Sequence, residues 1–146
     1  MCKVYKLYKC ANTLHKMKVP LLPRVLFCVV RVVFGGHVPY TATIGSGTSF
    51  GCGGLGVVLH PNTVIGENCM IAQNVTIGGR SDFPEVPKLG TNVFVGTGAK
   101  ILGPVRIGDN VTIGANAVVI RDIPSNSIAV GVPARIIKRK PAAEPT

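Results

Sequence analysis

The stretch LGTNVFVGTGAKILGPVRIGDNVTIGANAVV, residues 89–119, decides the fold. Within it an aliphatic residue returns at every sixth position, and the same spacing extends back to Leu59. The members of this series are Leu59, Ile65, Ile71, Ile77, Leu89, Val95, Ile101, Ile107, Ile113 and Val119, with one double step between Ile77 and Leu89. Gly follows the aliphatic residue at positions 66, 78, 90, 96, 108 and 114. A period of six fits neither an α-helix nor a simple alternating strand.

A six-residue period predicts a short strand followed by a tight turn. The aliphatic residue, and the small or β-branched residue four positions later, point inward, while the Gly permits the turn. Three such hexads form one triangular coil, and successive coils stack at the usual strand spacing of about 4.8 Å. The sequence therefore predicts a mainly β chain, a prism whose core is a column of aliphatic side chains.

Two interruptions break the repeat. Residues 79–88 contain Phe83, Pro84 and Pro87, and two prolines make a poor strand, so we expect a loop that projects from one edge. Residues 51–56 hold three residues more than the repeat allows. Insertions in such an economical repeat are the places where we expect chemistry, although slack surface loops are the alternative.

Charge is distributed unevenly along the chain. Residues 1–34 carry seven Lys and Arg and no acidic residue, whereas residues 35–134 carry equal numbers of acids and bases. We expect residues 1–36 to form a basic and apolar N-terminal extension, 37–134 the repeat domain, and 135–146 a basic C-terminal tail. A neutral body with few aromatic residues argues against a protein that binds nucleic acid.

The apolar run at residues 25–34 is too short to span a bilayer. It favours a short helical cap on the open end of the prism, which repeat proteins need. Contact of residues 1–34 with an anionic membrane surface is the alternative, and both roles are compatible. The Lys-rich start gives no signal-peptide pattern, and five Cys without paired spacing fit a reducing cytosol and no zinc site. We therefore expect a cytoplasmic protein, either free or peripheral at the inner face of the membrane.

His60 is the only one of three His residues inside the regular repeat. It follows the inward residue Leu59, so its ring is expected to point outward, directly beneath Gly78 and the projecting loop. A neutral imidazole in a cleft can take a proton from an attacking hydroxyl near pH 7, whereas an exposed turn His without a role is the alternative. His37 is expected to be structural, and Cys52 lacks a neighbour that would lower its pKa and make it a nucleophile.

Residues 39–137 resemble the catalytic domain of serine acetyltransferases and, more closely, their short relatives in capsule, exopolysaccharide and O-antigen biosynthesis. The matching stretches are GLGVVLHP (54–61), QNVTIGG (73–79), GTGAKILG (96–103) and GVPARI (131–136). The family has a left-handed β-helix, so the resemblance implies a left-handed parallel β-helix, here with a short N-terminal helical extension. It also implies a homotrimer that binds acetyl-CoA in the groove between neighbouring prisms.

The resemblance implies specific roles for several residues. The backbone of Gly79, Ala99 and Ala117 is expected near the pantetheine arm of acetyl-CoA, and Arg135 and Lys138 are expected toward its nucleotide phosphates. No metal ion is required.

For catalysis, we expect His60 to remove a proton from the acceptor hydroxyl and the Gly79 N–H to stabilise the oxyanion. Asp82 and Glu85 are candidates to orient His60 or the acceptor. Acidic residues of this kind are more often simply solvated in a loop.

The chain departs from long serine acetyltransferases at three catalytic positions. An Asp-His pair of those enzymes falls at Gly51-Cys52, an upstream Asp at His37, and a second His at Val86. The expected function is acetyl-CoA-dependent O-acetylation of a hydroxyl, with a sugar of surface polysaccharide biosynthesis as the first acceptor. Serine O-acetylation for cysteine biosynthesis is the alternative, and a catalytically silent trimeric scaffold is an alternative of another class.

Overall fold

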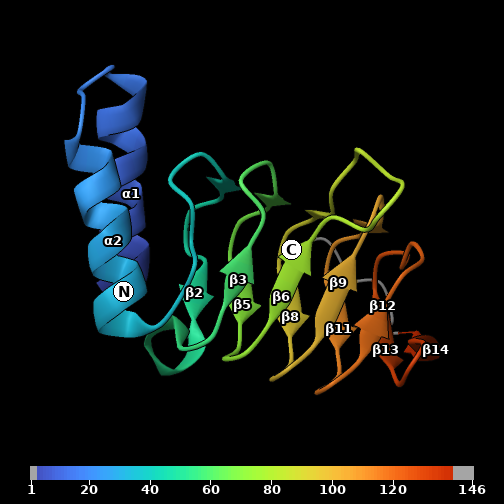
Figure 1. Ribbon diagram of the computed structural model, residues 1–146. Coiled ribbons are helices and arrows are strands. Elements are labelled where there is room, and N and C mark those ends of the chain that lie inside the picture. The colour runs from blue at the N-terminus through green and yellow to red at the C-terminus, as the bar shows by residue number, and fades with distance from the viewer. Residues whose placement is uncertain (1–2, 140–146) are drawn as a thin grey trace, which may run out of the picture.

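The computed structural model describes residues 3–139, which form a prism of stacked coils with two helices across one end (Figure 1). The prism has three faces, each a sheet of short strands. One sheet contains β1 (Thr43–Ile44), β4 (Val64–Ile65), β7 (Lys88–Leu89) and β10 (Arg106–Ile107). A second contains β2 (Ser49–Phe50), β5 (Met70–Ile71), β8 (Phe94–Val95), β11 (Thr112–Ile113), β13 (Ser127–Val130) and β14 (Arg135–Arg139). The third contains β3 (Val58–Leu59), β6 (Thr76–Gly78), β9 (Lys100–Leu102) and β12 (Val118–Val119).

The strand register confirms the six-residue repeat and both interruptions. Leu59 pairs with Ile77, eighteen residues on, as three hexads per coil require. Across the projecting loop the offset is twenty-four, as in the pair of Ile77 and Ile101. Across residues 51–56 the offset is twenty-one, in the pair of Phe50 and Ile71, which matches the three extra residues. Every aliphatic residue of the series from Leu59 to Val119 is buried, so the core is the expected column.

The role assigned to the Gly residues is wrong in one respect. The Gly that follows the inward residue does not supply the left-handed turn, because no such residue has a positive φ. At Gly66 a side chain is excluded by close approach, since a Cβ would collide with the carbonyl oxygen of Gly90 in the next coil. The left-handed conformation falls two residues later, most often on Asn: Asn68, Asn74, Asn92, Asn110 and Asn116 have φ between 53° and 60°. Asn tolerates this region better than other residues with side chains.

The expected loop at 79–88 is present, although its last residue, Lys88, already belongs to β7. It begins with a tight turn in which the Phe83 N–H donates to the Arg80 carbonyl at 3.1 Å. The Arg80 guanidinium lies over the Phe83 ring, 5.6 Å from its centroid. The loop projects from the prism above β6 (Figure 1).

The N-terminal extension forms two packed helices, α1 (Lys3–Lys16) and α2 (Leu22–Phe34). One face of α1 is buried, with Val4, Tyr5, Tyr8 and Ala11 at helical spacing. The Tyr8 hydroxyl donates to the Ala42 carbonyl at 2.6 Å and accepts from the Ile44 N–H at 3.2 Å, and burial raises the pKa of Tyr8. Helix α1 therefore closes the first coil, while α2 packs on α1.

The region expected to be a C-terminal tail is ordered as far as Arg139. A turn at residues 131–134 returns the chain, and β14 pairs antiparallel with β13. β14 is thus an antiparallel strand at the edge of a sheet whose other strands are parallel. Residues 140–146 of the expected tail lie outside the described residues.

Candidate active site

The candidate site residues lie along the sheet β12-β9-β6-β3. His60 directly follows β3, and its N–H donates to the Ile77 carbonyl at 2.8 Å. It is half-buried beside Gly78, at the base of the projecting loop, as the repeat predicted. Arg135, the first residue of β14, comes directly after the turn that borders the other end of this sheet, where the Ala134 N–H donates to the Val118 carbonyl of β12 at 2.8 Å. Three strand steps of about 4.8 Å place the two ends of this face about 14 Å apart.

The His60 ring has a defined orientation. The Asn62 backbone N–H donates to His60 Nδ1 at 3.1 Å. The neutral ring therefore carries its proton on Nε2, where it acts as a donor. For Nε2 to take a proton instead, the Nδ1 atom must be protonated and must release the Asn62 N–H.

His37 lies on the same face as His60. It forms a parallel bridge with Val58, and its N–H donates to the Val57 carbonyl at 2.7 Å. Side chains of bridged residues point to the same side of a sheet, so His37, Val58 and His60 all point outward. Burial lowers the pKa of His37, and the positive charge of Arg31 lowers it further. His37 is thus held in its neutral form near pH 7.

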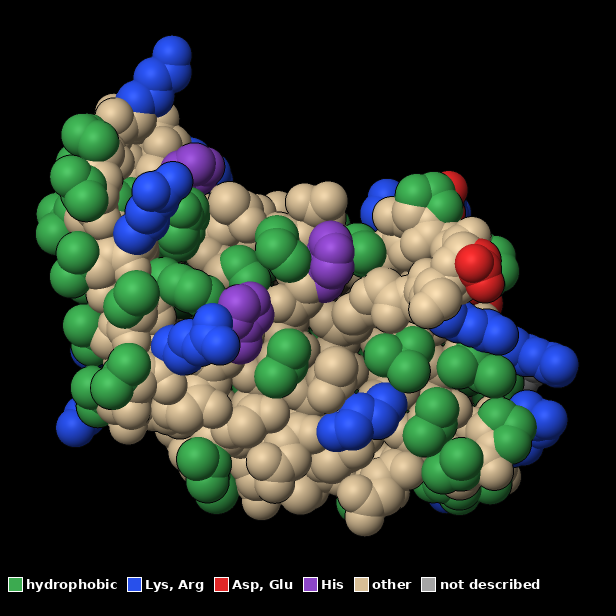
Figure 2. All heavy atoms as spheres, in the orientation of Figure 1, with side chains coloured by type: hydrophobic (Ala, Val, Ile, Leu, Met, Phe, Trp, Pro, Cys, Tyr) green, Lys and Arg blue, Asp and Glu red, His purple; other side chains and the backbone are tan. Residues whose placement is uncertain are grey.

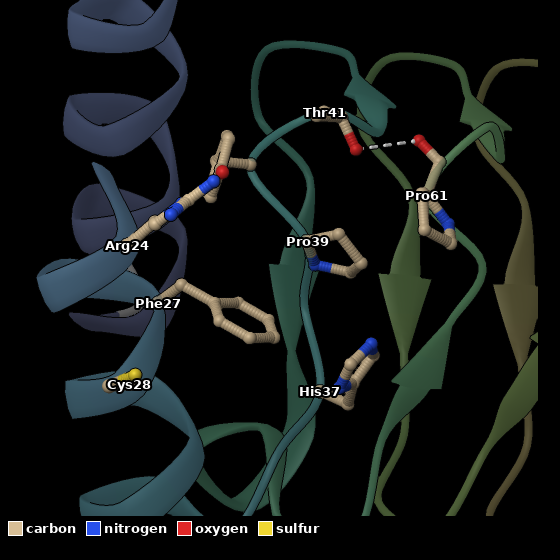
Figure 3. A pocket seen from close by; sticks show the side chains of 8 residues that line it. Arg24, Phe27, Cys28, His37, Pro39, Thr41 and Pro61 are labelled. Atoms are coloured by element: carbon tan, nitrogen blue, oxygen red, sulfur yellow. Dashed lines mark hydrogen bonds between the residues drawn. The ribbon is translucent and has the colours of Figure 1, made fainter. Parts of the chain in front are cut away.

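A cavity of about 520 Å³ lies between α2 and the first coils and is lined by His37. Its lining residues are Arg24, Phe27, Cys28, His37, Pro39, Tyr40, Thr41 and Pro61, the last adjacent in sequence to His60. Figure 3 shows Phe27 and Arg24 extending from α2 toward the segment that carries His37 and Pro39. The Phe27 and His37 rings pack edge to face at 5.0 Å, and the Thr41 hydroxyl donates to the Pro61 carbonyl at 3.1 Å.

The sequence did not predict this cavity. Its walls come from α2 and from coils that lie close only after the helix has packed. The signal available in the sequence was the aromatic residue Phe27 within the apolar run at residues 25–34, which alone does not identify a site.

The two loop acids do not engage His60 within this protomer. Among residues 3–139, neither Asp82 nor Glu85 forms a hydrogen bond or ion pair with the His60 ring. Glu85 lines a separate cavity of about 260 Å³ with Val86, Lys88 and Arg106. Asp82 is exposed in the turn, in a left-handed conformation with φ 76°.

The residues expected to contact acetyl-CoA differ in accessibility. Gly79, Arg135 and Lys138 are exposed. Ala99 and Ala117 are fully buried, and their carbonyls accept from the N–H groups of neighbouring strands at 3.0 and 2.8 Å. Their N–H groups are also hydrogen-bonded within the coil. The side chains of these two alanines are therefore out of reach of acetyl-CoA. Any contact with them must be made through backbone groups that already form hydrogen bonds within the prism.

Of the positions that depart from the family pattern, His37 lies on this face, whereas Val86 lines the separate cavity with Glu85. Cys52 is an exposed thiol in the short 3₁₀ segment η1 (Gly51–Gly54), held in a left-handed conformation with φ 46°. This segment forms the inserted turn just before β3.

Comparisons with known proteins agree with the fold. The family Bacterial transferase hexapeptide (six repeats) matches residues 87–121. Serine acetyltransferase of Helicobacter pylori is 42% identical over 134 residues, which cover 90% of this chain and 78% of that protein. Serine acetyltransferase of Synechococcus elongatus is 40% identical over 134 residues, and the chain spans only 54% of its length.

Solved structures give the same result. Serine acetyltransferase of Brucella abortus in complex with coenzyme A superposes with a TM-score of 0.88 at 30% identity, covering 94% of this chain and 55% of that one. Soybean serine acetyltransferase complexed with serine superposes with a TM-score of 0.84 at 34% identity, covering 92% and 56%. The expected left-handed parallel β-helix with a short helical extension is confirmed by these likenesses and by the sheet order. Since the identity to the Helicobacter pylori protein extends over most of both chains, this chain belongs to the serine acetyltransferase family.

Proposed function

We propose that this chain transfers an acetyl group from acetyl-CoA to the hydroxyl of a small acceptor. The observation that carries the proposal is the arrangement around one sheet, with the outward imidazole of His60 at one end and the exposed Arg135 just beyond β12 at the other. A relative of the same fold has been solved in complex with coenzyme A. Beyond β12, Arg135 and Lys138 of β14 are the cations that would hold phosphates, and the thioester would reach His60 and Gly79.

The proposed chemistry is direct transfer. The acceptor oxygen attacks the thioester carbonyl as a histidine takes its proton, and the N–H of Gly79 stabilises the oxyanion. The C–S bond then breaks, and the thiolate leaving group takes the proton back from the imidazolium. His60 can accept that proton at Nε2 once its Nδ1 atom releases Asn62.

In the tautomer that the hydrogen bond from Asn62 favours, the same Nε2 atom would donate to the oxyanion. The neutral ring of His37, on the same face, is then the second candidate for the base.

The acceptor that the relatives support is serine. Both curated relatives described above are named serine acetyltransferases, and the soybean enzyme was solved with serine. These names favour serine over the sugar that the sequence placed first. Asp82 and Glu85 are the loop acids available to hold the serine ammonium group, if a neighbouring protomer brings them to the cleft.

A sugar hydroxyl is the second candidate, and the cavity beside His37 favours it. Two aromatic rings and two prolines line this cavity together with Arg24, and no acidic residue does. Sugar rings stack on such surfaces through their apolar faces, whereas the ammonium group of serine would find no carboxylate there.

We further propose that the active assembly is a homotrimer. Met70 and Phe94 pair in register on the sheet that contains β5 and β8, and they are 41% and 45% exposed. Two large apolar side chains side by side on a flat face suit the packing of a neighbouring prism. Such packing would turn the sheet face of His60 into one wall of a groove between protomers.

The test is release of free thiol from acetyl-CoA by the full chain, with L-serine and with a panel of hexoses and amino sugars. We expect acceptor-dependent release with serine, and release with sugars alone would move the assignment to the second candidate. Arg135→Ala is expected to raise the Kd for coenzyme A about tenfold without unfolding. Absence of release with every acceptor, in a protein that still binds coenzyme A, would identify a silent scaffold.

A further inference from the structure

Helix α2 presents an apolar face that no other residue of the described chain covers. This outer face consists of Leu21, Leu22, Val25, Val29, Val32 and Val33, which are between 36% and 82% exposed. The opposite side of the helix, with Pro23 and Val30, is buried. Figure 2 shows these hydrophobic side chains gathered along the outer edge of the helices, at the end of the molecule away from the projecting loop.

The exposure is too large and too contiguous for isolated surface residues. Val32 is 82% exposed and Val33 67%, on successive positions of the helix. Contiguous apolar patches on soluble domains mark surfaces that contact another apolar phase. Nothing in the fold of residues 3–139 requires Val or Leu at these positions, since the prism is already closed by α1.

All the charged residues of the helical region within residues 3–34 are cations, and Arg24 lies directly beside the outer face. Arg24 and Arg31 are seven positions apart and therefore lie on the same side of α2, along one border of the face. The other cations of the helical region are Lys3, Lys6, Lys9, Lys16 and Lys18, and all are exposed. Residues 3–34 contain no Asp or Glu. A partner that complements this region must therefore combine an apolar surface with negative charge.

The placement of the face matters as much as its composition. The helices stand across the end of the prism (Figure 1), so the outer face is directed along the prism and away from His60. Neither helix within residues 3–139 is both long and apolar enough to cross a bilayer. A short amphipathic helix with cations beside its apolar stripe lies in the plane of the lipid headgroups.

We infer that the outer face of α2 docks on an anionic lipid surface, with Val25, Val29 and Val32 at the acyl boundary and the basic residues among the headgroups. A second copy of the chain fits the surface poorly. A two-fold contact through α2 would bring Arg24, Arg31 and the lysines against their own copies, with no acid among residues 3–34 to pair with them. An anionic leaflet supplies that missing charge.

The experiment is flotation of the full chain with vesicles of phosphatidylcholine alone and of phosphatidylcholine with 30% phosphatidylglycerol. The wild type is expected to float with the anionic vesicles and to lose most of this binding in 0.5 M NaCl, because salt screens surface charge. Val32→Glu is expected to lower the partition coefficient about tenfold or more. Val132→Glu is the matched control, since Val132 is a 72% exposed valine at the opposite end of the prism.

Light scattering on the same variants separates the alternatives. Loss of flotation in Val32→Glu, with flotation retained in Val132→Glu and an unchanged particle mass, supports membrane docking. A wild type that stays with neither vesicle, a Val32→Glu variant that floats as the wild type does, or a Val32→Glu particle of lower mass would overturn it. The last result would make the face an interface between copies. None of these readouts depends on acetyl transfer.

Discussion

At the scale of single residues, two threonines share the inward position four places after an aliphatic residue but differ in hydrogen bonding. Thr48 and Thr63 both occupy this position and are both buried. The Thr48 hydroxyl donates to the Gly66 carbonyl at 2.9 Å and accepts from the Cys69 N–H at 3.1 Å. The Thr63 hydroxyl is buried without a hydrogen-bond partner among residues 3–139. The hydroxyl of Thr48 therefore stabilises the fold, whereas the hydroxyl of Thr63 destabilises it.

Thr63→Val is expected to stabilise the protein by about 1 kcal/mol, because it removes a buried hydroxyl that has no partner and keeps the shape. Thr48→Val is the matched control and is expected to cost about 1–3 kcal/mol, because it leaves the Cys69 N–H and the Gly66 carbonyl unpaired. Urea denaturation followed by circular dichroism gives both values. Equal changes for the two variants would show that the Thr63 hydroxyl is satisfied in solution.

At the scale of elements, the stack of coils depends on close backbone approach at most of the Gly residues that follow an inward aliphatic residue. Gly66 and Gly78 hold the same place in the repeat, but only Gly66 faces another coil closely. A Cβ at Gly78 would have nothing within 4 Å, because the chain leaves the prism there to form the projecting loop.

Gly66→Ala is therefore expected to destabilise the fold by about 1–3 kcal/mol, since backbone of the next coil must move. Gly78→Ala is expected to be neutral or stabilising by about 0.5 kcal/mol, since Gly78 has no positive φ. Thermal unfolding of the two variants beside the wild type measures the difference. A Gly66→Ala protein as stable as Gly78→Ala would contradict the packing described here.

The prism could be predicted from the sequence because its signal is local and repeated. The same residue class at one spacing identified the core column, both insertions and the position of His60 beneath the loop. The Asn turns were missed because Gly is the more usual carrier of positive φ, whereas the Gly in this repeat is needed for close approach. The cavity beside His37 and strand β14 were missed because each depends on contacts between distant segments, α2 with the first coils and residues 135–139 with β13.

At the scale of the whole molecule, charge and chemistry are separated along the prism. The cationic helices occupy one end, β14 with Arg135 and Lys138 the other, and the sheet that carries His60 runs between them (Figure 1). This arrangement would leave the sheet face free for acetyl-CoA and an acceptor while the helical end rests on another surface.

The transfer rate of His60→Ala, with coenzyme A binding measured on the same protein, tests the central claim most directly. Thiol release from acetyl-CoA with the preferred acceptor should fall by about 10²–10⁴-fold, because the group that moves the proton or holds the oxyanion is gone. The Kd for coenzyme A and the melting temperature should stay near those of the wild type. A His60→Ala protein that transfers acetyl at the wild-type rate would contradict the account.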